Sequence, residues 1–445
     1  MKRSLYNRLL EWKNDPSRKP LVLEGARQVG KTWLLKEFGK NEYDNIVYVN
    51  FHDDPDAQII FQQNLKVDRI MESLETITHQ KIVAGKTLIF MDEIQEARRG
   101  LDSLKYFCED AREQHVAVAG SLLGTTHRKG ESYPVGKVNL LTLYPMNFEE
   151  FLWAKGEEKI ADILCRNDWE MANLLEPKLQ ELLRQYYFVG GMPEAVLQYT
   201  TKGDVNKVRT IQLEILRTYD NDFAKHAGEE TERIRMIWES IPAQLAKENK
   251  KFIYGAVKEG GRARDFEIAI EWLVRAGLVY KIRRCKVPEM PLKFYEDFDA
   301  FKLYLLDVGL LGALSQASPR LMLISNEVFT SFKGAFTENY VLEQLKTLDN
   351  LHVYYFSKDN STQEVDFLIQ TQERVLPIEV KAEENVKSKS LRQFVTIDHA
   401  DKNLKGLRCS MKPYIDQGWM ENIPLYGILG YMSQLLQKER FIYTS

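Results

Sequence analysis

Cysteine is scarce in this chain of 445 residues, and long apolar runs, repeats and a strong net charge are also missing. No disulfide framework or zinc site is expected, because no C-x-x-C pair occurs among the four cysteines, Cys108, Cys165, Cys285 and Cys409. No run reaches the roughly 18 apolar residues of a membrane span, and residues 1–8 lack the apolar core of a signal peptide. With a formal charge of -3, any basic surface must be local. We therefore expect a cytoplasmic protein of about three domains with no membrane partner.

A complete G-x-x-x-x-G-K-[ST] loop runs from Gly25 to Thr32, directly after the apolar run Leu21–Leu23. Such a loop turns its backbone N–H groups toward phosphates, while Lys31 neutralises the β- and γ-phosphate oxygens and Thr32 offers a hydroxyl to Mg²⁺. The helix expected at Lys31–Phe38 adds its N-terminal dipole to this anion site. The residues expected to hold ATP are Gly25, Ala26, Arg27, Gln28, Val29, Gly30, Lys31, Thr32 and Trp33.

Short strand-like runs alternate with helical patterns as far as Leu143, which predicts a mostly parallel sheet with crossover helices. The expected strands are Leu21–Glu24, Ile46–Phe51, Leu88–Asp92, Val116–Gly120 and Val138–Leu143. The third ends in two carboxylates, as a Walker B segment does: Asp92 would hold Mg²⁺, and Glu93 would orient and deprotonate the attacking water. Because a whole strand separates the loop from Asp92 along the chain, we expect an additional-strand P-loop ATPase.

Ser121 follows the fourth expected strand, where such ATPases place a polar residue between the two nucleotide motifs. It is expected either to contact the γ-phosphate or the attacking water, or to cap the next turn. Arg128 and Lys137 come next. They are candidates for the basic residue that assists hydrolysis, or they are solvated residues of a loop.

Four segments together resemble prokaryotic AAA+-like ATPases: Gly25–Thr32, Asp92–Gln95, Ala119–Ser121 and Leu143–Phe151. Gly190–Glu194 and Lys333–Glu338 extend the resemblance over nearly the whole chain, in the order of a family whose C-terminal domain is of uncharacterised function. The resemblance implies nucleotide binding and hydrolysis, with no settled physiological substrate.

The predicted fold is an α/β multidomain chain: a P-loop ATPase core at 1–146, a helical lid at 147–228, a winged helix at 229–318 and a nuclease-like domain at 319–445. The winged helix rests on a helix at Ala263–Ala276 followed by strands near Gly277–Ile282 and Phe301–Leu306. Lysine and arginine are frequent from Lys247 to Lys286, as on a phosphate-contacting surface. Winged helices also bind proteins, so DNA, RNA, a protein partner and a second copy of the chain stay open as partners.

Three C-terminal carboxylates form a second constellation. If the strands Val365–Gln370 and Val375–Lys381 are joined by a two-residue turn, Asp366 lies opposite Glu379 and Lys381 projects from the same face. Opposed carboxylates repel unless a cation or proton intervenes, which favours a metal. Glu338 lies on the apolar face of its expected helix, so its side chain should point inward. A carboxylate buried there without a partner is costly.

This order of helix, strands and carboxylates resembles the PD-(D/E)xK nuclease core. The resemblance implies that Asp366 and Glu379 bind Mg²⁺ or Mn²⁺, that Glu338 supports a metal or water, and that Lys381 activates water or stabilises the phosphorane. The alternative is an ordinary charged hairpin. Two functions follow: an Mg²⁺-dependent ATPase that drives a nuclease-like domain acting on nucleic acid, or an ATP-dependent switch or scaffold whose C-terminal domain is an inactive partner-binding module.

Overall fold

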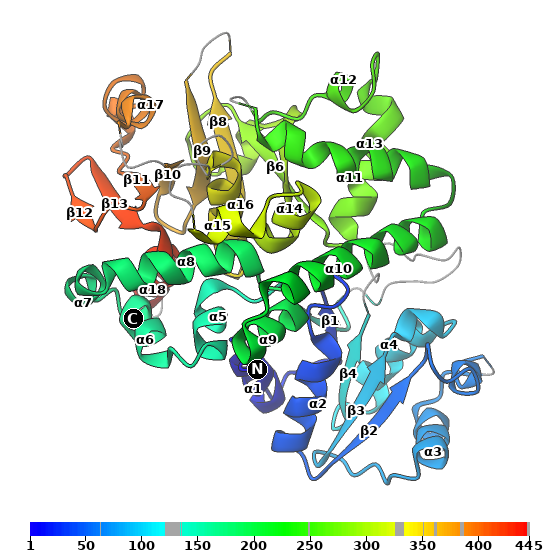
Figure 1. Cartoon of the computed structure of the whole chain (residues 1–445). Helices are drawn as coiled ribbons and strands as arrows, with labels where there is room; N and C mark the ends of the chain where they lie inside the picture. Colours follow the sequence, from blue (N-terminus) through cyan, green and yellow to red (C-terminus); the bar gives the residue numbers. More distant parts are fainter. Residues whose placement is uncertain are drawn as a thin grey trace. The chain divides into compact units, whose positions relative to one another are not determined.

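The computed structural model describes residues 1–62, 64–120, 134, 136–247, 250–324, 333–349, 351–359, 363–382 and 387–442 (Figure 1). The chain divides into two compact units, residues 1–144 with 275–278 and residues 145–274 with 279–445. The first unit nearly coincides with the predicted ATPase core. The other three predicted domains share the second unit. In the described part of the chain, no helix combines the length and the apolar character needed to cross a membrane.

The first unit is built on a five-stranded parallel sheet with the order β2-β3-β4-β1-β5. Its strands are β1 (Leu21–Glu24), β2 (Asn45–Asn50), β3 (Thr87–Asp92), β4 (His115–Ala119) and β5 (Asn139–Thr142), and its helices are α1 (Tyr6–Asn14), α2 (Lys31–Glu42), α3 (Val67–Thr78) and α4 (Gly100–Asp110). Each strand lies where the sequence predicts it. In the sheet, however, β4 separates β1 from β3, whereas β2, the extra strand along the chain, forms the edge.

Helices cover both faces of this sheet. Val22 and Ile89 on one face pack in a core with Phe107 of α4. On the other face α2 approaches so closely that a Cβ on Gly39 would lie 2.6 Å from Ile46 Cδ1. A parallel sheet covered on both faces explains the continuous apolar runs of its strands. It also places the loops after β1 and β3 at the carboxyl edge, where such sheets bind ligands.

The second unit contains fourteen helices and eight strands among its described residues. Its helices are α5 (Phe148–Ala154), α6 (Glu158–Cys165), α7 (Trp169–Leu174), α8 (Glu176–Val189), α9 (Pro193–Lys202), α10 (Val205–His226), α11 (Thr231–Leu245), α12 (Tyr254–Val257), α13 (Ala263–Arg275), α14 (Val308–Leu314), α15 (Pro319–Ile324), α16 (Lys333–Lys346), α17 (Lys389–Gln393) and α18 (Ile428–Ile442). Its strands are β6 (Val279–Cys285), β7 (Glu296–Leu305), β8 (Val353–Ser357), β9 (Glu364–Gln370), β10 (Val375–Val380), β11 (Gly406–Ser410), β12 (Ile415–Asp416) and β13 (Met420–Pro424).

These strands form one sheet with the order β12-β13-β11-β10-β9-β8-β6-β7. The antiparallel hairpin β6–β7, predicted as the wing of a separate domain, joins β8 through the parallel pair Arg284 and Tyr355. The predicted boundary at residue 318 therefore does not separate two compact bodies. The hairpin β9–β10 has the predicted register, with Gln370 opposite Val375.

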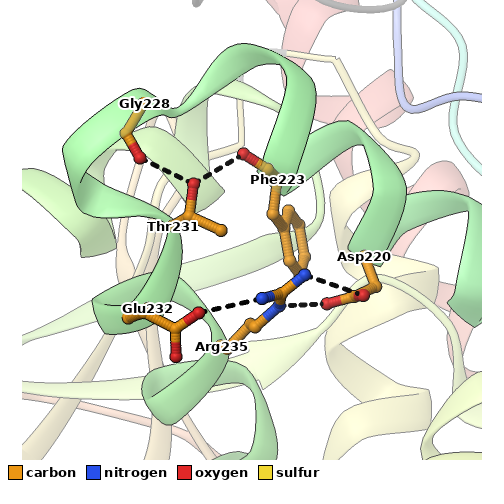
Figure 2. A network of polar contacts seen from close by, with 6 residues as sticks. All are labelled: Asp220, Phe223, Gly228, Thr231, Glu232 and Arg235. Atoms are coloured by element: carbon orange, nitrogen blue, oxygen red, sulfur yellow. Dashed lines mark hydrogen bonds and ion pairs between the residues drawn. The ribbon is translucent and has the colours of Figure 1, made fainter.

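Side-chain contacts also bridge the predicted boundary at residue 228, where α10 turns into α11. Figure 2 shows Arg235 of α11 between Asp220 of α10 and Glu232. Its Nε donates to Asp220 Oδ1 at 2.6 Å and its Nη1 to Glu232 Oε1 at 2.9 Å. The Thr231 hydroxyl donates to the carbonyl of Phe223 at 3.0 Å. Hydrogen bonds and an ion pair thus connect α10 of the predicted lid to α11 of the predicted winged helix.

The Gly190-Gly191 pair follows α8 at a point where neighbouring atoms leave no space for a side chain. A Cβ on Gly191 would lie 2.0 Å from Met146 O, and a Cβ on Gly190 would lie 2.3 Å from Asp307 Oδ1. The N–H of Gly191 donates to Asp307 Oδ2 at 2.5 Å, and Asp307 Oδ1 accepts from the N–H of Leu310, which caps α14. The Asp307 carboxylate at Gly190 and the Met146 backbone at Gly191 leave no room for a side chain, which explains why both positions hold glycine.

Candidate functional site

The loop after β1 has a backbone that favours glycine at two positions. Gly25 has a φ of 145° and Gly30 a φ of 96°, values that residues with a Cβ rarely adopt. A Cβ on Gly25 would also lie 2.2 Å from Leu143 O. Because Gly30 immediately precedes α2, the loop ends at a helix N-terminus, a place suited to phosphate.

Lys31 is folded over this loop. Its Nζ donates to the carbonyls of Gly25 at 2.9 Å and Ala26 at 2.8 Å, and the residue is only 6% exposed. Burial lowers the pKa of Lys31 to about 8, although the nearby carboxylates of Glu93 and Asp92 oppose this shift. An anion bound at the loop would favour the charged form of Lys31.

Thr32 and Asp92 meet at the carboxyl edge of the sheet. Thr32 Oγ1 donates to Asp92 Oδ2 at 2.8 Å, and the Tyr48 hydroxyl lies 3.3 Å from the same oxygen. Asp92 is 2% exposed, and burial raises its pKa. A carboxylate whose partners are hydroxyl groups retains oxygen lone pairs for a hard cation, so the donor set fits Mg²⁺.

Glu93 lies on the turn that follows β3. Its backbone is left-handed, with a φ of 50°, and its N–H donates to Asp92 Oδ1 at 3.2 Å. The Gln95 side-chain amide donates to the Glu93 carboxylate. The sharp turn and the amide together hold Glu93 beside Asp92, where a carboxylate can accept a proton.

The other predicted loop residues divide by exposure. Ala26 and Val29 are buried, whereas Arg27, Gln28 and Trp33 are exposed. The two buried residues therefore belong to the packing of the loop, whereas the other three are accessible to solvent.

Two residues at this site were not predicted. The Arg3 guanidinium donates to Val29 O at 2.8 Å and to Tyr144 O at 2.6 Å, and so ties the loop to the segment after β5. The other is Tyr48, which contacts Asp92. A single arginine near the start of a chain carries no pattern, and the contact of Tyr48 depends on the pairing of β2 with β3, which no short sequence pattern records.

Ser121 and Arg128 lie outside the described residues. Lys137, the other basic candidate, pairs with Glu109 of α4 at 2.8 Å. Its ammonium thus has a partner within the first unit.

In the second unit, Glu338 is held by a lysine and a tyrosine. Lys250 Nζ lies 2.5 Å from Glu338 Oε1, the Tyr304 hydroxyl donates to Oε2 at 3.0 Å, and Glu338 is 3% exposed. Burial opposes its ionisation, yet Lys250 and Lys302 hold the pKa of Glu338 below its usual value. The carboxylate is inward-facing as predicted, but with a cationic partner that the sequence did not suggest.

Asp366 belongs to the same charged cluster. Its Oδ2 accepts from the N–H of Val380 at 2.7 Å. Burial, followed by the charge of Glu338, raises the pKa of Asp366 to about 7. Lys302, which is 0% exposed, is paired with Glu364. The two lysines pair with Glu338 and Glu364, and Asp366, the third carboxyl group of the cluster, retains its proton readily.

Glu379 and Lys381 form the pair that the sequence offered as an alternative to a metal site. Lys381 Nζ lies 3.1 Å from Glu379 Oε1, and Glu379 is 4% exposed. Within the described ranges, no group of three or more His, Cys, Asp or Glu side chains is placed to hold a metal ion. The geometry thus brings Asp366 near Glu338 but does not assemble Glu338, Asp366 and Glu379 into one ligand set.

Several residues of the predicted basic surface are engaged within the second unit. Besides Lys250, which is buried against Glu338, Lys281 pairs with Glu271 at 2.6 Å and Arg284 with Asp297 at 2.5 Å. Fewer cations are therefore available for phosphates than the composition of this segment suggests.

Comparison with protein families gives three matches along the chain. Residues 17–152 match the family described as AAA domain. Residues 180–321 and 333–426 match two families described as domains of unknown function, DUF8612 and DUF4143. The first match covers the loop, Asp92 and Glu93, and supports an AAA+-like P-loop ATPase unit.

A relative along almost the whole length is the "Uncharacterized protein MJ1544" of Methanocaldococcus jannaschii, which is 26% identical over 94% of this chain and 87% of its own. Among solved structures, Caenorhabditis elegans PCH-2 is 10% identical over 49% of this chain and 69% of its own, with a TM-score of 0.29. The Thermotoga maritima RuvB Holliday junction branch migration motor is 14% identical over 63% and 89%, with a TM-score of 0.28.

Proposed function

We propose that this chain binds ATP with Mg²⁺ at the Gly25–Thr32 loop and hydrolyses the bond between its β- and γ-phosphates. The observation that carries the proposal is the 2.8 Å hydrogen bond between Thr32 Oγ1 and Asp92 Oδ2. It joins the phosphate loop to the end of β3, so the two residue types that hold Mg²⁺ in P-loop ATPases lie side by side.

Each residue of this centre has one task. Lys31 would exchange its two carbonyl acceptors for phosphate oxygens, and the N-terminus of α2 would supply further donors. Thr32 and Asp92 would hold Mg²⁺, whose charge neutralises the phosphates. Glu93, steadied by Gln95, would accept the proton of the attacking water. If Ser121 contributes, it would contact the γ-phosphate or that water.

Steady-state ATP hydrolysis by the purified full-length chain tests this assignment. We expect turnover to collapse in Lys31→Ala and in Glu93→Gln. Lys40→Ala is the matched control, because Lys40 is exposed on the same helix as Lys31. Turnover that stays at the wild-type level in both variants would contradict the proposal.

The second unit is proposed as the part that the ATP cycle switches. Its helices α11–α13 followed by the hairpin β6–β7 have the element order of a winged helix, a module that binds nucleic acid or protein. The buried cluster of Glu338, Asp366, Lys250 and Lys302 supports a structural role for these carboxylates, in a domain without catalysis. Lysines already supply the positive charge that a metal would bring.

The competing function is a metal-dependent nuclease that uses Glu338, Asp366, Glu379 and Lys381. Cleavage of single- and double-stranded DNA and RNA, measured with Mg²⁺ or Mn²⁺, separates the two. If the second unit is a switch without catalysis, no cleavage that depends on Asp366 should be detected. Cleavage by the wild type that is lost in both Asp366→Ala and Lys381→Ala would establish the nuclease instead.

A further inference from the structure

A cavity of about 470 Å³ lies within the second unit, away from the carboxylate cluster. Its floor is one face of the sheet, where Leu407 of β11 lies opposite Glu421 of β13 and both line the cavity with Leu376 of β10. Glu379 is paired in register with Arg408, the residue after Leu407. Because side chains alternate along a strand, Glu379 projects from the opposite face. The cavity is thus a different place from the predicted metal site.

Four cations and a single carboxylate line this cavity: Arg166, Arg374, Lys405 and Lys438, with Glu421. Two of the cations are already engaged, since Lys405 pairs with Glu421 at 2.6 Å and Arg374 with Glu439 at 3.2 Å. Arg166 and Lys438 are exposed and have no side-chain partner among the described residues. The lining therefore has a surplus of positive charge, suited to a phosphate group.

Aromatic rings form one wall. Trp169 of α7 and Tyr414 stack with ring centroids 5.1 Å apart and planes inclined by 8°. Tyr431 of α18 donates its hydroxyl to Glu421. Flat aromatic side chains beside cations are the means by which proteins hold an unpaired base and its phosphate. The Glu421 carboxylate accepts from both Lys405 and Tyr431 and so holds these two side chains in the lining.

We propose that this cavity binds a nucleotide unit, an unpaired base with its 5′-phosphate. The base stacks on the Trp169–Tyr414 wall and the phosphate lies between Arg166 and Lys438. Its volume falls in the range of about 300–1,000 Å³ that small-ligand sites occupy. The unit can come from a free mononucleotide or from a single-stranded nucleic acid. The site is independent of ATP hydrolysis in the first unit.

The test measures the binding of AMP by calorimetry and of a fluorescein-labelled thymidine hexanucleotide by anisotropy. Both use the full-length Lys31→Ala chain, so that the phosphate loop contributes little. We expect Trp169→Leu to weaken binding about tenfold or more, and Trp169→Phe to retain most of it, because stacking needs a flat ring. Hexanucleotide binding with weak AMP binding identifies a strand segment as the source, and equal affinities identify a free nucleotide.

A charge variant keeps the test independent of folding around Trp169. The double variant Arg166→Glu and Lys438→Glu changes two exposed side chains and should also weaken binding at least about tenfold. Lys159→Glu, an exposed lysine of α6 outside the lining, should bind as the parent does. The proposal is overturned if neither probe binds, or if both the Trp169→Leu and the double charge variant bind like the parent.

Discussion

Asp92 in the first unit and Asp366 in the second are both strand carboxylates whose pKa is raised by burial, but their partners differ. Asp92 accepts from the hydroxyl groups of Thr32 and Tyr48. Asp366 lies in the field of Lys250 and Lys302. Hydroxyl partners leave the oxygens of Asp92 available for Mg²⁺. Burial beside Glu338 instead keeps Asp366 protonated, and a protonated carboxyl group is a poor ligand for a metal ion. An aspartate on a strand therefore does not by itself predict a metal site, because the groups around it decide whether its oxygens are available to a cation.

The largest contrast is expected in catalysis. Asp92→Asn should lower ATP turnover by about 10²–10³-fold, because the carboxylate that holds Mg²⁺ is lost. Asp366→Asn should leave turnover within about twofold, since its amide still accepts from the N–H of Val380. Parallel ATPase assays of the two variants check this, and equal losses would remove the distinction between the two carboxylates.

The carboxylate cluster of the second unit should matter for stability and not for ATP turnover. Glu338→Gln leaves Lys250 buried without its partner and should lower the unfolding free energy of the second unit by about 3 kcal/mol. The double variant Glu338→Gln with Lys250→Met should recover most of this loss. Urea unfolding provides the measurement. A single variant as stable as the wild type would show that the pair is not a structural element.

Asp366 should give stability a particular pH dependence. Its folded-state pKa, about 7, lies above the ordinary value of 3.8, so the stability it favours at low pH is lost as pH rises through 7. Asp366→Asn should therefore be more stable than the wild type at pH 8, by up to about 4 kcal/mol, with the difference shrinking toward pH 4. Unfolding curves at both pH values test the sign. A variant less stable than the wild type at pH 8 would contradict it.

Nucleotide affinity should depend on the charge of Lys31. Because its pKa is about 8 and phosphate binds the charged form, affinity for a non-hydrolysable ATP analogue should fall above pH 8. The fall should approach about tenfold per pH unit. Lys31→Arg should show no such fall, since arginine stays protonated. Calorimetric titrations between pH 7 and pH 9.5 measure both, and parallel profiles would rule out Lys31 as the titrating group.

The sequence predicted the first unit well, because its signals are local. The loop, the five strands and the approach of Thr32 to Asp92 follow from one motif and from the alternation of strand and helix. The order of the sheet was not accessible in this way. That β4 lies between β1 and β3 depends on which crossover connections pack best, and no short pattern records it.

The C-terminal site was predicted only in part, because its decisive residues come from distant segments. The β9–β10 register and the inward direction of Glu338 follow from turn length and helix periodicity. Lys250 and Lys302 are far from these carboxylates along the chain, and Lys250 had the pattern of a phosphate-binding surface. The joining of β6–β7 to β8 brings such segments together, and it depends on packing across the whole unit.

Counting the manganese ions bound per chain tests the central contrast most directly. Mn²⁺ binding is measured by electron paramagnetic resonance in the Glu93→Gln variant, with and without ATP. We predict one Mn²⁺ per chain with ATP and none without it, and the same counts when Asp366→Ala is added. A second ion, or an ion bound without ATP that disappears with Asp366→Ala, would show that the C-terminal carboxylates form a metal centre and would contradict the account.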